Sequence, residues 1–472
     1  MLKRLLFYSL LALSIASGVF QTSCRKKDIY NTSPSAMLSF STNIVKFDTV
    51  FTSVGSATHN FTAKNPGKQA VNISDIRLQG GSSSRFTINI DGRDNYDFPN
   101  HELAAGDSIY IFAKVHIDPN DVNTPFIVTD TILFILNGHT QKVALQAFGR
   151  NAHFIKNRVL GCDTVFRNDG KPIVLYDTAY VPKGCSLTVE QGVTVYCHAN
   201  AILLIGGSLT CEGTKAMPVI FREDRLEHSY DNTAGQWYGI WILTTSDTNS
   251  MAHTIIQDGI NGLRVDSLSR IPGTVKMTMN KCIIRNCSQE GLVGFGASIT
   301  ATNSLLYGNE LDNLRVDLGG NYNFSNCTFD ESNDPVANRQ SSIQLGNTLY
   351  KNADSIAFLQ DLNIAFRNCI IWGDIDDEVQ FNKHSNGNAF NAIFYHDIIK
   401  AKKINFNNTN TLNQYPIFKD EGGGDYHIET QSPAIDKGVT YPPIPVIDDL
   451  DDNIRKTPTD TIPDLGSYEF KP

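Results

Sequence analysis

The sequence predicts an all-β protein that consists of a two-sheet sandwich, a long solenoid of stacked coils and a C-terminal cap. Two observations lead to the sandwich and the solenoid. Apolar and polar residues alternate with period 2 over residues 36–150, and a short apolar phrase returns about every 22 residues downstream. A chain of 472 residues has room for such a series of domains.

The composition is that of a folded protein, and it argues against one class of partner. The chain is 41% hydrophobic and 19% charged, which is ordinary for globular domains. Its net charge is −9, whereas a surface that binds nucleic acid needs a strongly basic patch. We therefore expect no nucleic-acid partner.

The chain begins with a short apolar segment that ends near a cysteine. Lys3 and Arg4 precede the apolar stretch Leu5–Phe20, and small residues then lead to Cys24. This stretch is shorter than the ~20 residues of a typical membrane-spanning helix. The pattern resembles a bacterial lipoprotein signal peptide, although Gln21 stands where that family usually has Leu.

The resemblance implies a lipid-anchored protein of the cell envelope. Residues 1–23 would be removed, Cys24 would be lipidated, and residues 24–35 would form a tether. Acyl chains would anchor the protein in the outer membrane at ~0.8 kcal/mol for each buried CH₂ group. The sequence leaves open whether the protein faces the periplasm or the surface. The alternative is an ordinary secretory signal with a chance cysteine.

Residues 36–150 carry the pattern of a β-sandwich. Val143, Leu145 and Ala147 alternate with polar or small residues, and Asn137-Gly138 is a strong signal for a hairpin turn. The order of the phrases "FDTVFTSVGSATHNFTAKN", "GDSIYIFAKVHIDP" and the hairpin resembles immunoglobulin-like domains of secreted bacterial and centrosomal proteins. The resemblance implies a spacer or adhesion module.

Residues 151–400 contain two repeated phrases. The first begins with a small residue followed by two apolar or hydroxyl residues, at 254, 282, 304, 327 and 369, so that the intervals are 28, 22, 23 and 42 residues. Asn precedes the small residue at 303, 326 and 368. The second phrase contains Leu263, Leu292, Leu314 and Ile343. A period near 22 predicts a solenoid whose coils stack ~4.8 Å apart, and the interval of 42 predicts one further coil.

These repeats resemble the right-handed parallel β-helix of pectin-lyase-like proteins. The segments 186–221 and 236–242 resemble the opening coils of that family. The register places Cys282, Cys327 and Cys369 in one inward column, with an intervening coil between each pair, so we expect reduced thiols. Elsewhere, two further pairs could form disulfides: Cys162 with Cys185, and Cys197 with Cys211.

Residues 401–472 carry the most specific phrases of the chain. "YPIFKDEGGGDYHIETQSPAIDKG", "DDLDDNIR" and "PDLGSYEF" resemble, in this order, the choice-of-anchor-type terminal module of bacterial surface β-helix proteins, although Asp452 replaces the usual Gly. We expect a structural cap in which Arg455 offers a planar fork to carboxylates. The alternative is a metal or catalytic site. The cap residues are Asp436, Arg455, Asp464 and Glu469.

The second repeated phrase suggests a ligand site. In "NGLRVD" and "DNLRVD", Leu and Val face inward, so that Arg264 and Arg315 face outward two coils apart with Val293 between them. Asp266 and Asp317 follow them. Such a pair could hold an acidic sugar chain, whereas the structural alternative is a solvated face with local ion pairs.

The sequence favours binding over catalysis. It lacks the "NTDG" and "GHG" signatures of pectin hydrolases, and we identify no metal ligands or cofactor site. We therefore predict an envelope lipoprotein whose β-helix binds or displays, and a polysaccharide is one candidate ligand. The alternatives are a polysaccharide lyase, which would add Ca²⁺, a glycoside hydrolase, and a structural adhesin. Trp237, Tyr238 and Trp241 could stack on sugars, but alternation predicts that two of them point inward.

Overall fold

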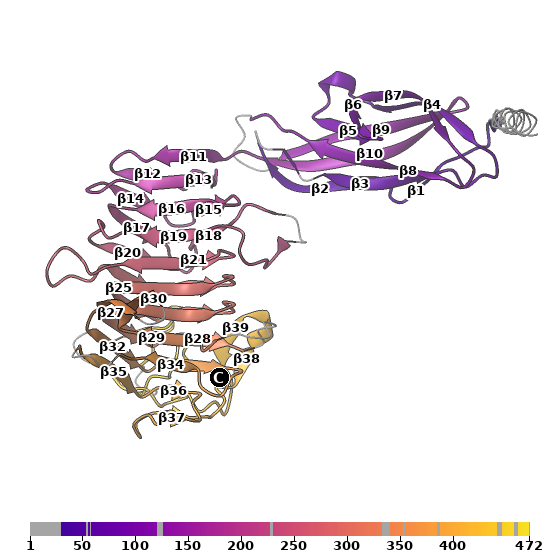
Figure 1. The fold of residues 1–472 in the computed structure, drawn as a ribbon. Helices are drawn as coiled ribbons and strands as arrows, with labels where there is room; N and C mark the ends of the chain where they lie inside the picture. The colour runs from indigo at the N-terminus through magenta and orange to yellow at the C-terminus, as the bar shows by residue number, and fades with distance from the viewer. Residues whose placement is uncertain are drawn as a thin grey trace, which may run out of the picture. The chain divides into compact units, whose positions relative to one another are not determined.

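The computed structural model describes most of the chain after the first 29 residues. The described residues are 30–52, 55–56, 58–119, 126–226, 230–332, 340–352, 355–384, 388–440, 446–456 and 461–471. The predicted signal peptide, Cys24 and the first part of the tether lie outside them. The described chain forms two compact units, of which the first ends at Gly149 and the second begins at Arg150 (Figure 1).

The first unit is a sandwich of two antiparallel five-stranded sheets. The first sheet has the order β1 (Ser39–Phe40), β3 (His59–Lys64), β8 (Ser108–Val115), β5 (Phe86–Ile90) and β6 (Arg93–Asn95). The second has the order β2 (Ile44–Phe51), β10 (His139–Arg150), β9 (Phe126–Leu136), β4 (Val71–Leu78) and β7 (Asp97–Leu103). A 3₁₀ turn, η1 (Gly81–Ser83), joins β4 to β5.

The predicted strand alternation and the predicted hairpin turn of this unit are both confirmed. Val143, Leu145 and Ala147 are buried in the core, since alternate residues of a strand face the same side. β9 and β10 form a hairpin in which Leu136 pairs with His139. The two turn residues, Asn137 and Gly138, have φ values of 48° and 82°, which a type I′ turn requires.

The second unit contains a 25-stranded parallel sheet wound into coils, which confirms the predicted fold class (Figure 1). Its first strands are β11 (His153–Val159), β12 (Thr164–Phe166), β13 (Ile173–Val181), β14 (Ser186–Val189), β15 (Thr194–Cys197), β16 (Ile202–Ile205), β17 (Ser208–Glu212), β18 (Val219–Glu223), β19 (Gly239–Ile242), β20 (Asn249–Ala252), β21 (Thr254–Gln257) and β22 (Leu263–Asp266). The later strands are β23 (Met277–Asn280), β24 (Ile283–Arg285), β25 (Glu290–Thr302), β26 (Leu305–Tyr307), β27 (Asp312–Ser325), β28 (Thr328–Glu331), β29 (Ile343–Gly346), β32 (Leu362–Arg367), β33 (Ile370–Gly373), β34 (Val379–Asn382), β35 (Phe390–Tyr395), β36 (Ile398–Ile399) and β37 (Thr411–Leu412).

The repeated phrases occupy equivalent positions in successive coils. Leu263, Leu292, Leu314 and Ile343 are in register and buried in one core. One column of the first phrase, which includes Ile284 and Phe329, also points into this core. Each coil therefore contributes an apolar layer that its neighbours cover, as the period predicts.

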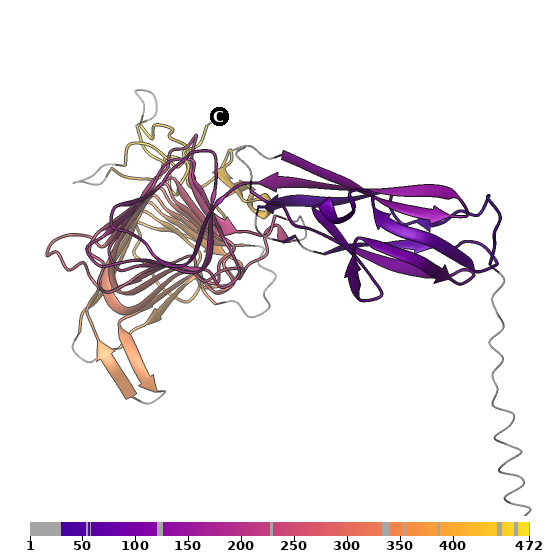
Figure 2. The same ribbon diagram turned by 90° about the horizontal axis from the view of Figure 1, so that it is seen from above.

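The prediction of a further coil within the 42-residue interval is wrong. Thr328 pairs directly with Ile370, so β28 and β33 lie on adjacent coils. Part of the interval forms an antiparallel hairpin, β30 (Thr348–Asn352) and β31 (Ser355–Leu359), which projects from the outline of the coils in Figure 2. An insertion at a corner lengthens one coil without adding a layer. Cys327 and Cys369 are therefore neighbours, yet both remain buried thiols, as does Cys282.

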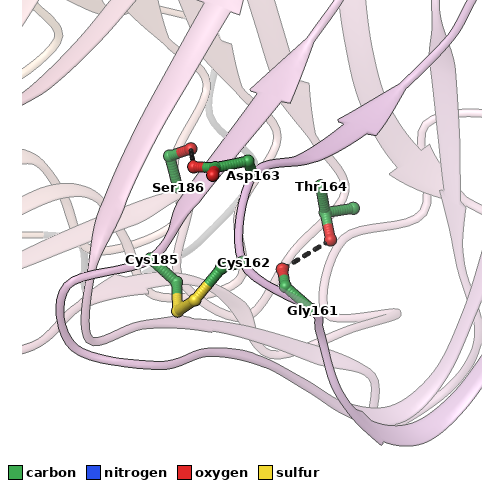
Figure 3. The surroundings of a disulfide bond; sticks show 6 residues. All are labelled: Gly161, Cys162, Asp163, Thr164, Cys185 and Ser186. Carbon is green, nitrogen blue, oxygen red and sulfur yellow. Dashed lines mark hydrogen bonds between the residues drawn. A yellow bond between two sulfur atoms is a disulfide. The ribbon is translucent and has the colours of Figure 1, made fainter.

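One of the two candidate disulfides is present. Cys162 is bonded to Cys185 beside the first coil (Figure 3). In the same turn the Thr164 hydroxyl donates to the carbonyl of Gly161 at 2.7 Å. The other pairing is wrong, because Cys197 on β15 and Cys211 on β17 occupy strands that are not paired with each other, and both are buried free thiols.

Two different segments cover the coils near the C-terminus. Ile404, Phe406 and Leu412 pack against the core of the last coils. The described residues of the segments 415–440, 446–456 and 461–470 instead pack on outward residues along the side of the coils, among them Leu305 and Ile370. This lateral module contains β38 (Phe418–Asp420), η3 (Glu421–Gly423) and β39 (Asp425–Ile428).

The asparagines of the first phrase hold the module in place. Asn303, Asn326 and Asn368 have φ values of 48°, 52° and 54°, so each makes a sharp left-handed bend between two strands. The Asn326 amide donates to the carbonyl of Asp464 at 3.2 Å, and the Asn368 amide donates to the carbonyl of Val439 at 2.8 Å. The repeated Asn thus serves both the bend and the lateral contact.

Candidate functional site

One candidate site is a groove on the outer surface of the β-helix, with a volume of about 950 Å³. Its floor is formed by the outward faces of β25, β27, β32 and β35, and it is bordered by the loop 267–275, which joins β22 to β23. We call this feature the asparagine groove. The residues that line it include Leu268, Ile271, Val275, Ser298, Asn321, Asn323, Asn363, Arg367, Asn391 and Ile393.

A ladder of amides runs along the floor of the groove. Asn321, Asn363 and Asn391 are in register on three successive coils and are exposed. The Asn363 amide donates to Asn321 Oδ1 at 3.1 Å, and the Asn391 amide donates to Asn363 Oδ1 at 2.8 Å. Each NH₂ group has two hydrogens, and these bonds use only one from each of Asn363 and Asn391. The ladder can therefore bind hydroxyl or amide groups of a ligand.

Apolar side chains line the same groove. Leu268, Ile271 and Val275 on the loop are 39%, 46% and 37% exposed, and Ile393 on β35 is 50% exposed. Isolated exposed apolar residues are common on protein surfaces, but here four of them share one cavity with the amide ladder. The groove thus offers both hydrogen bonds and apolar contact to a ligand.

The electrostatic character of the groove differs from that of the whole chain. Among the described residues that line it, Arg367 is charged, and neither Asp nor Glu occurs. Arg367 donates from Nη1 to the side-chain oxygen of Asn323. The chain as a whole has 49 acidic and 40 basic residues, so the groove, with one cation and no acid in its described lining, departs from the average of the chain.

Arg264, one of the predicted ligand residues, lies on the neighbouring outer face. Its register neighbour is Val293, which pairs in turn with Arg315, so the two arginines are two coils apart as the spacing predicts. Arg264 Nε donates to Asp266 Oδ1 at 2.9 Å. Its guanidinium also lies 4.5 Å from the ring centre of Trp241. It is half-buried in contacts within its own chain.

Arg315 is also engaged by neighbouring carboxylates. Its Nε donates to Asp317 Oδ2 at 2.9 Å, and its Nη1 donates to Glu290 Oε1 at 3.1 Å. Partly exposed ion pairs of this kind contribute little to stability, but their carboxylates offset the positive charge that would attract an acidic ligand. The structure therefore brings Arg264, Asp266, Arg315 and Asp317 onto one face as two internally paired sets.

The three aromatic residues near this face do not follow the prediction that two of them point inward. Trp237 is fully buried, Tyr238 is 47% exposed, and Trp241 faces outward with its indole N–H donating to Asp266 at 2.8 Å. Only one of these rings is thus in the core, rather than two, because strand alternation begins only at β19, two residues after Trp237.

The predicted cap residues lie in the lateral module. Arg455 is buried and donates from Nη1 to Glu469 Oε2 at 3.1 Å. The carboxylate of Asp464 instead accepts the backbone N–H groups of Asp436 at 2.7 Å and of Phe470 at 2.6 Å. Asp436 itself is exposed, with φ of 55°. These bonds link parts of the module that lie outside β38 and β39 and are far apart in the sequence.

A buried acid adjoins the Arg315 set. Asp312 is in register with Glu290 on the preceding coil and accepts a hydrogen bond from Gln344 Nε2 at 2.8 Å. Burial raises the pKa of Asp312 to about 7, although the bond from Gln344 opposes this increase. Neither Asp312 nor the groove was predicted from the sequence. Within the residues that the structure describes, no group of three or more His, Cys, Asp or Glu could hold a metal ion.

The stability of the second unit should fall as the pH rises from 5 to 8. Burial raises the pKa of Asp312 and Asp330 to about 7 and that of Asp397 to about 8. Unfolded Asp has a pKa near 4, so between about pH 4 and 8 the folded state binds more protons, and unfolding releases them. A tenfold difference in proton affinity between the two states corresponds to about 1.4 kcal/mol. The free energy of unfolding of the second unit should therefore decrease by several kcal/mol between pH 5 and pH 8.

Thermal unfolding at pH 5 and pH 8 measures this effect. The variant Asp312→Asn should be more stable than the parent at pH 8 and should show a smaller difference between the two pH values. A higher melting temperature at pH 8 than at pH 5 would contradict the assignment of these acids as protonated in the folded state.

No helix within the described residues has the length and apolar character needed to cross a membrane.

No protein-family model matches the sequence, and no curated protein matches it. Solved structures match only distantly. The ASH/PapD-like domain 7 of human CEP192 is 10% identical, with a TM-score of 0.17, and the match covers 27% of this chain and 91% of that domain.

Two further structural matches are similarly distant. The Escherichia coli chaperone DraB is 11% identical, with a TM-score of 0.17 and coverage of 25% of this chain and 55% of its own. A Porphyromonas gingivalis W83 protein of unknown function is 10% identical, with a TM-score of 0.16 and coverage of 27% and 60%. The chain therefore spans less than two thirds of both proteins, and these scores carry no argument about function.

Proposed function

We propose that the protein is a lipid-anchored protein of the bacterial outer membrane whose β-helix binds an extended glycan. The observation that carries the proposal is the asparagine groove, in which Asn321, Asn363 and Asn391 present one amide on each of three successive coils. Coils repeat about every 4.8 Å, which is close to the length of one sugar ring along a polymer. A glycan lying along the helix axis would then meet one amide per sugar.

The location in the envelope is supported by the sequence. The segment before Cys24 resembles a lipoprotein signal, the coils resemble pectin-lyase-like β-helices, and the C-terminal phrases resemble a choice-of-anchor-type module. The sandwich would act as a spacer between the anchor and the groove. Whether the protein faces the periplasm or the surface is a separate question, which protease accessibility on whole cells answers.

A polysaccharide lyase or glycoside hydrolase is the alternative. Lyases need a basic residue beside carboxylates, and hydrolases need a pair of carboxylic acids within reach of the substrate. The described lining of the groove contains neither arrangement. New double-bond absorbance or new reducing ends after incubation with polysaccharides would establish the enzyme instead.

Retention of the mature chain on immobilised neutral and uronic-acid glycans tests the proposal. The triple variant Asn321→Ala, Asn363→Ala and Asn391→Ala should bind at least about tenfold more weakly, because each hydrogen bond contributes about 0.5–1.5 kcal/mol. These side chains are exposed, so the fold should be unaffected.

The same assay separates the two candidate faces. The double variant Arg264→Ala and Arg315→Ala should leave retention unchanged if the ligand occupies the groove. If only the arginine variant weakens retention, the binding site is the face formed by Arg264, Asp266, Arg315 and Asp317. If no glycan is retained, the proposal fails.

Replacement of Cys24 by Ser should release the protein from membranes, and continued membrane attachment would exclude the lipid anchor.

A further inference from the structure

Two chemically different kinds of side chain line the asparagine groove, and a sugar chain that carries only hydroxyl groups would match just one of them. The amide ladder suits hydroxyl groups, but Leu268, Ile271, Val275 and Ile393 present aliphatic groups to the same space. A sugar that carries only hydroxyl groups would leave much of this apolar surface without a matching partner. The ligand should therefore contain methyl groups in addition to hydrogen-bonding groups.

We infer that the groove recognises glycans that carry acetamido groups, and this inference rests on the proposed function. An acetamido group combines an amide, which can donate to and accept from an Asn side chain, with a methyl group, which can pack against an aliphatic side chain. It is uncharged, in agreement with a described lining that has one guanidinium and no carboxylate. An O-acetyl ester is also uncharged and carries a methyl group, but it lacks the N–H that can donate to an Asn side-chain oxygen.

The placement of the apolar residues supports this ligand class. Asn391 and Ile393 are two residues apart on β35, so both side chains project outward from the same strand. Ile271 approaches from the bordering loop, where the Thr274 N–H donates to the Ile271 carbonyl at 3.2 Å and forms a turn. The ladder and the aliphatic groups can thus contact different parts of one substituent.

The groove should accommodate about two such substituents from a β-1,4-linked polymer. Ser298, Asn321, Asn363 and Asn391 span four coils, which is ~14 Å at ~4.8 Å per coil. Alternate sugars of a β-1,4-linked chain point their substituents to the same side. Burial of one methyl group corresponds to roughly fourfold in affinity, so two correspond to more than tenfold.

Calorimetric titration of the mature chain with chitohexaose and cellohexaose tests this inference. The two hexamers share the same linkage and are both uncharged, and they differ in the acetamido groups. Chitohexaose should bind at least tenfold more tightly. Equal affinities, or binding of other glycans from the panel but of neither hexamer, would overturn the acetamido inference while leaving glycan binding in place. Failure of every glycan would remove the proposed function as well.

Variants of two apolar side chains in the groove test whether they contact the acetamido group. Ile271→Asn together with Ile393→Asn should reduce the ratio of the two affinities to below about threefold and leave cellohexaose binding within about twofold of the parent. The matched control is Val159→Asn, since Val159 is 63% exposed on β11 and does not line the groove. It should leave both affinities unchanged. An unchanged ratio in the isoleucine variant would show that these side chains do not contact the acetamido group.

Discussion

Replacement of Arg455 by alanine should lower the free energy of unfolding of the second unit by about 3–5 kcal/mol, as expected when one partner of a buried ion pair is removed. Arg455 is buried and joins the module to the coils. Its Nη2 donates to the carbonyl of Gly466 at 2.8 Å and to Asn303 Oδ1 at 2.9 Å, in addition to the ion pair with Glu469. Alanine would leave these acceptors buried without their donor.

Urea unfolding followed by tryptophan fluorescence measures this loss. All three tryptophans, at 237, 241 and 372, belong to the second unit, so the signal is not mixed with that of the sandwich. The double variant Arg455→Ala and Glu469→Gln should lose less than the sum of the single variants, because the two groups interact. Lys456→Ala, at the exposed neighbouring position, is the control. A loss below about 1 kcal/mol for Arg455→Ala would contradict the assigned role.

Replacement of Phe366 by alanine should cost about 3–5 kcal/mol, which is the usual range for a buried Phe. Phe366 on β32 is fully buried and stacks between rings on the adjacent coils. Its ring centre lies 5.2 Å from that of Phe324 and 4.9 Å from that of Phe394, with 12° between the planes in each case. Its loss would leave a cavity in the middle one of three successive layers.

The matched control for this prediction is Phe358→Ala. Phe358 lies on β31 of the projecting hairpin and is 64% exposed, so its truncation should change the stability by less than about 0.5 kcal/mol. Both variants are measured by the same fluorescence-detected unfolding. Equal effects of the two substitutions would contradict the predicted inward column and with it the stacking of the coils.

The fold was largely predictable because it depends on local periodicity. The positions of Leu263, Leu292, Leu314 and Ile343 fixed the register of four coils, since each must bury its apolar side against the next. The extra coil was predicted wrongly because an insertion of about one period makes a single coil look like two when only the spacing is known. The hairpin β30–β31 is such an insertion.

The asparagine groove was harder to predict because its residues are far apart in sequence. Asn321, Asn363 and Asn391 meet only when the coils stack, and the hairpin disguises the first interval. A signal was nevertheless present: the motif N-x-x-F occurs at 321–324, 363–366 and 391–394. Its Phe marks the inward column, and its Asn, three residues earlier, therefore faces outward.

The paired state of the arginines could not be predicted from spacing. The sequence shows that Arg264 and Arg315 face outward, but not that Trp241 stacks against the first or that Glu290 reaches the second across coils. Such contacts depend on side-chain directions between neighbouring layers. The same holds for Asp312, whose burial depends on the residues that cover it.

Hydroxyl-radical footprinting of the mature chain, with and without a retained glycan, tests the central claim most directly. The claim is that the ligand lies in the asparagine groove, so Leu268, Ile271 and Ile393 should become protected from oxidation when the glycan is added. Trp241 and Phe295, beside Arg264, should react as before. Protection of Trp241 and Phe295 with unchanged reactivity in the groove would place the ligand on the arginine face and contradict the account.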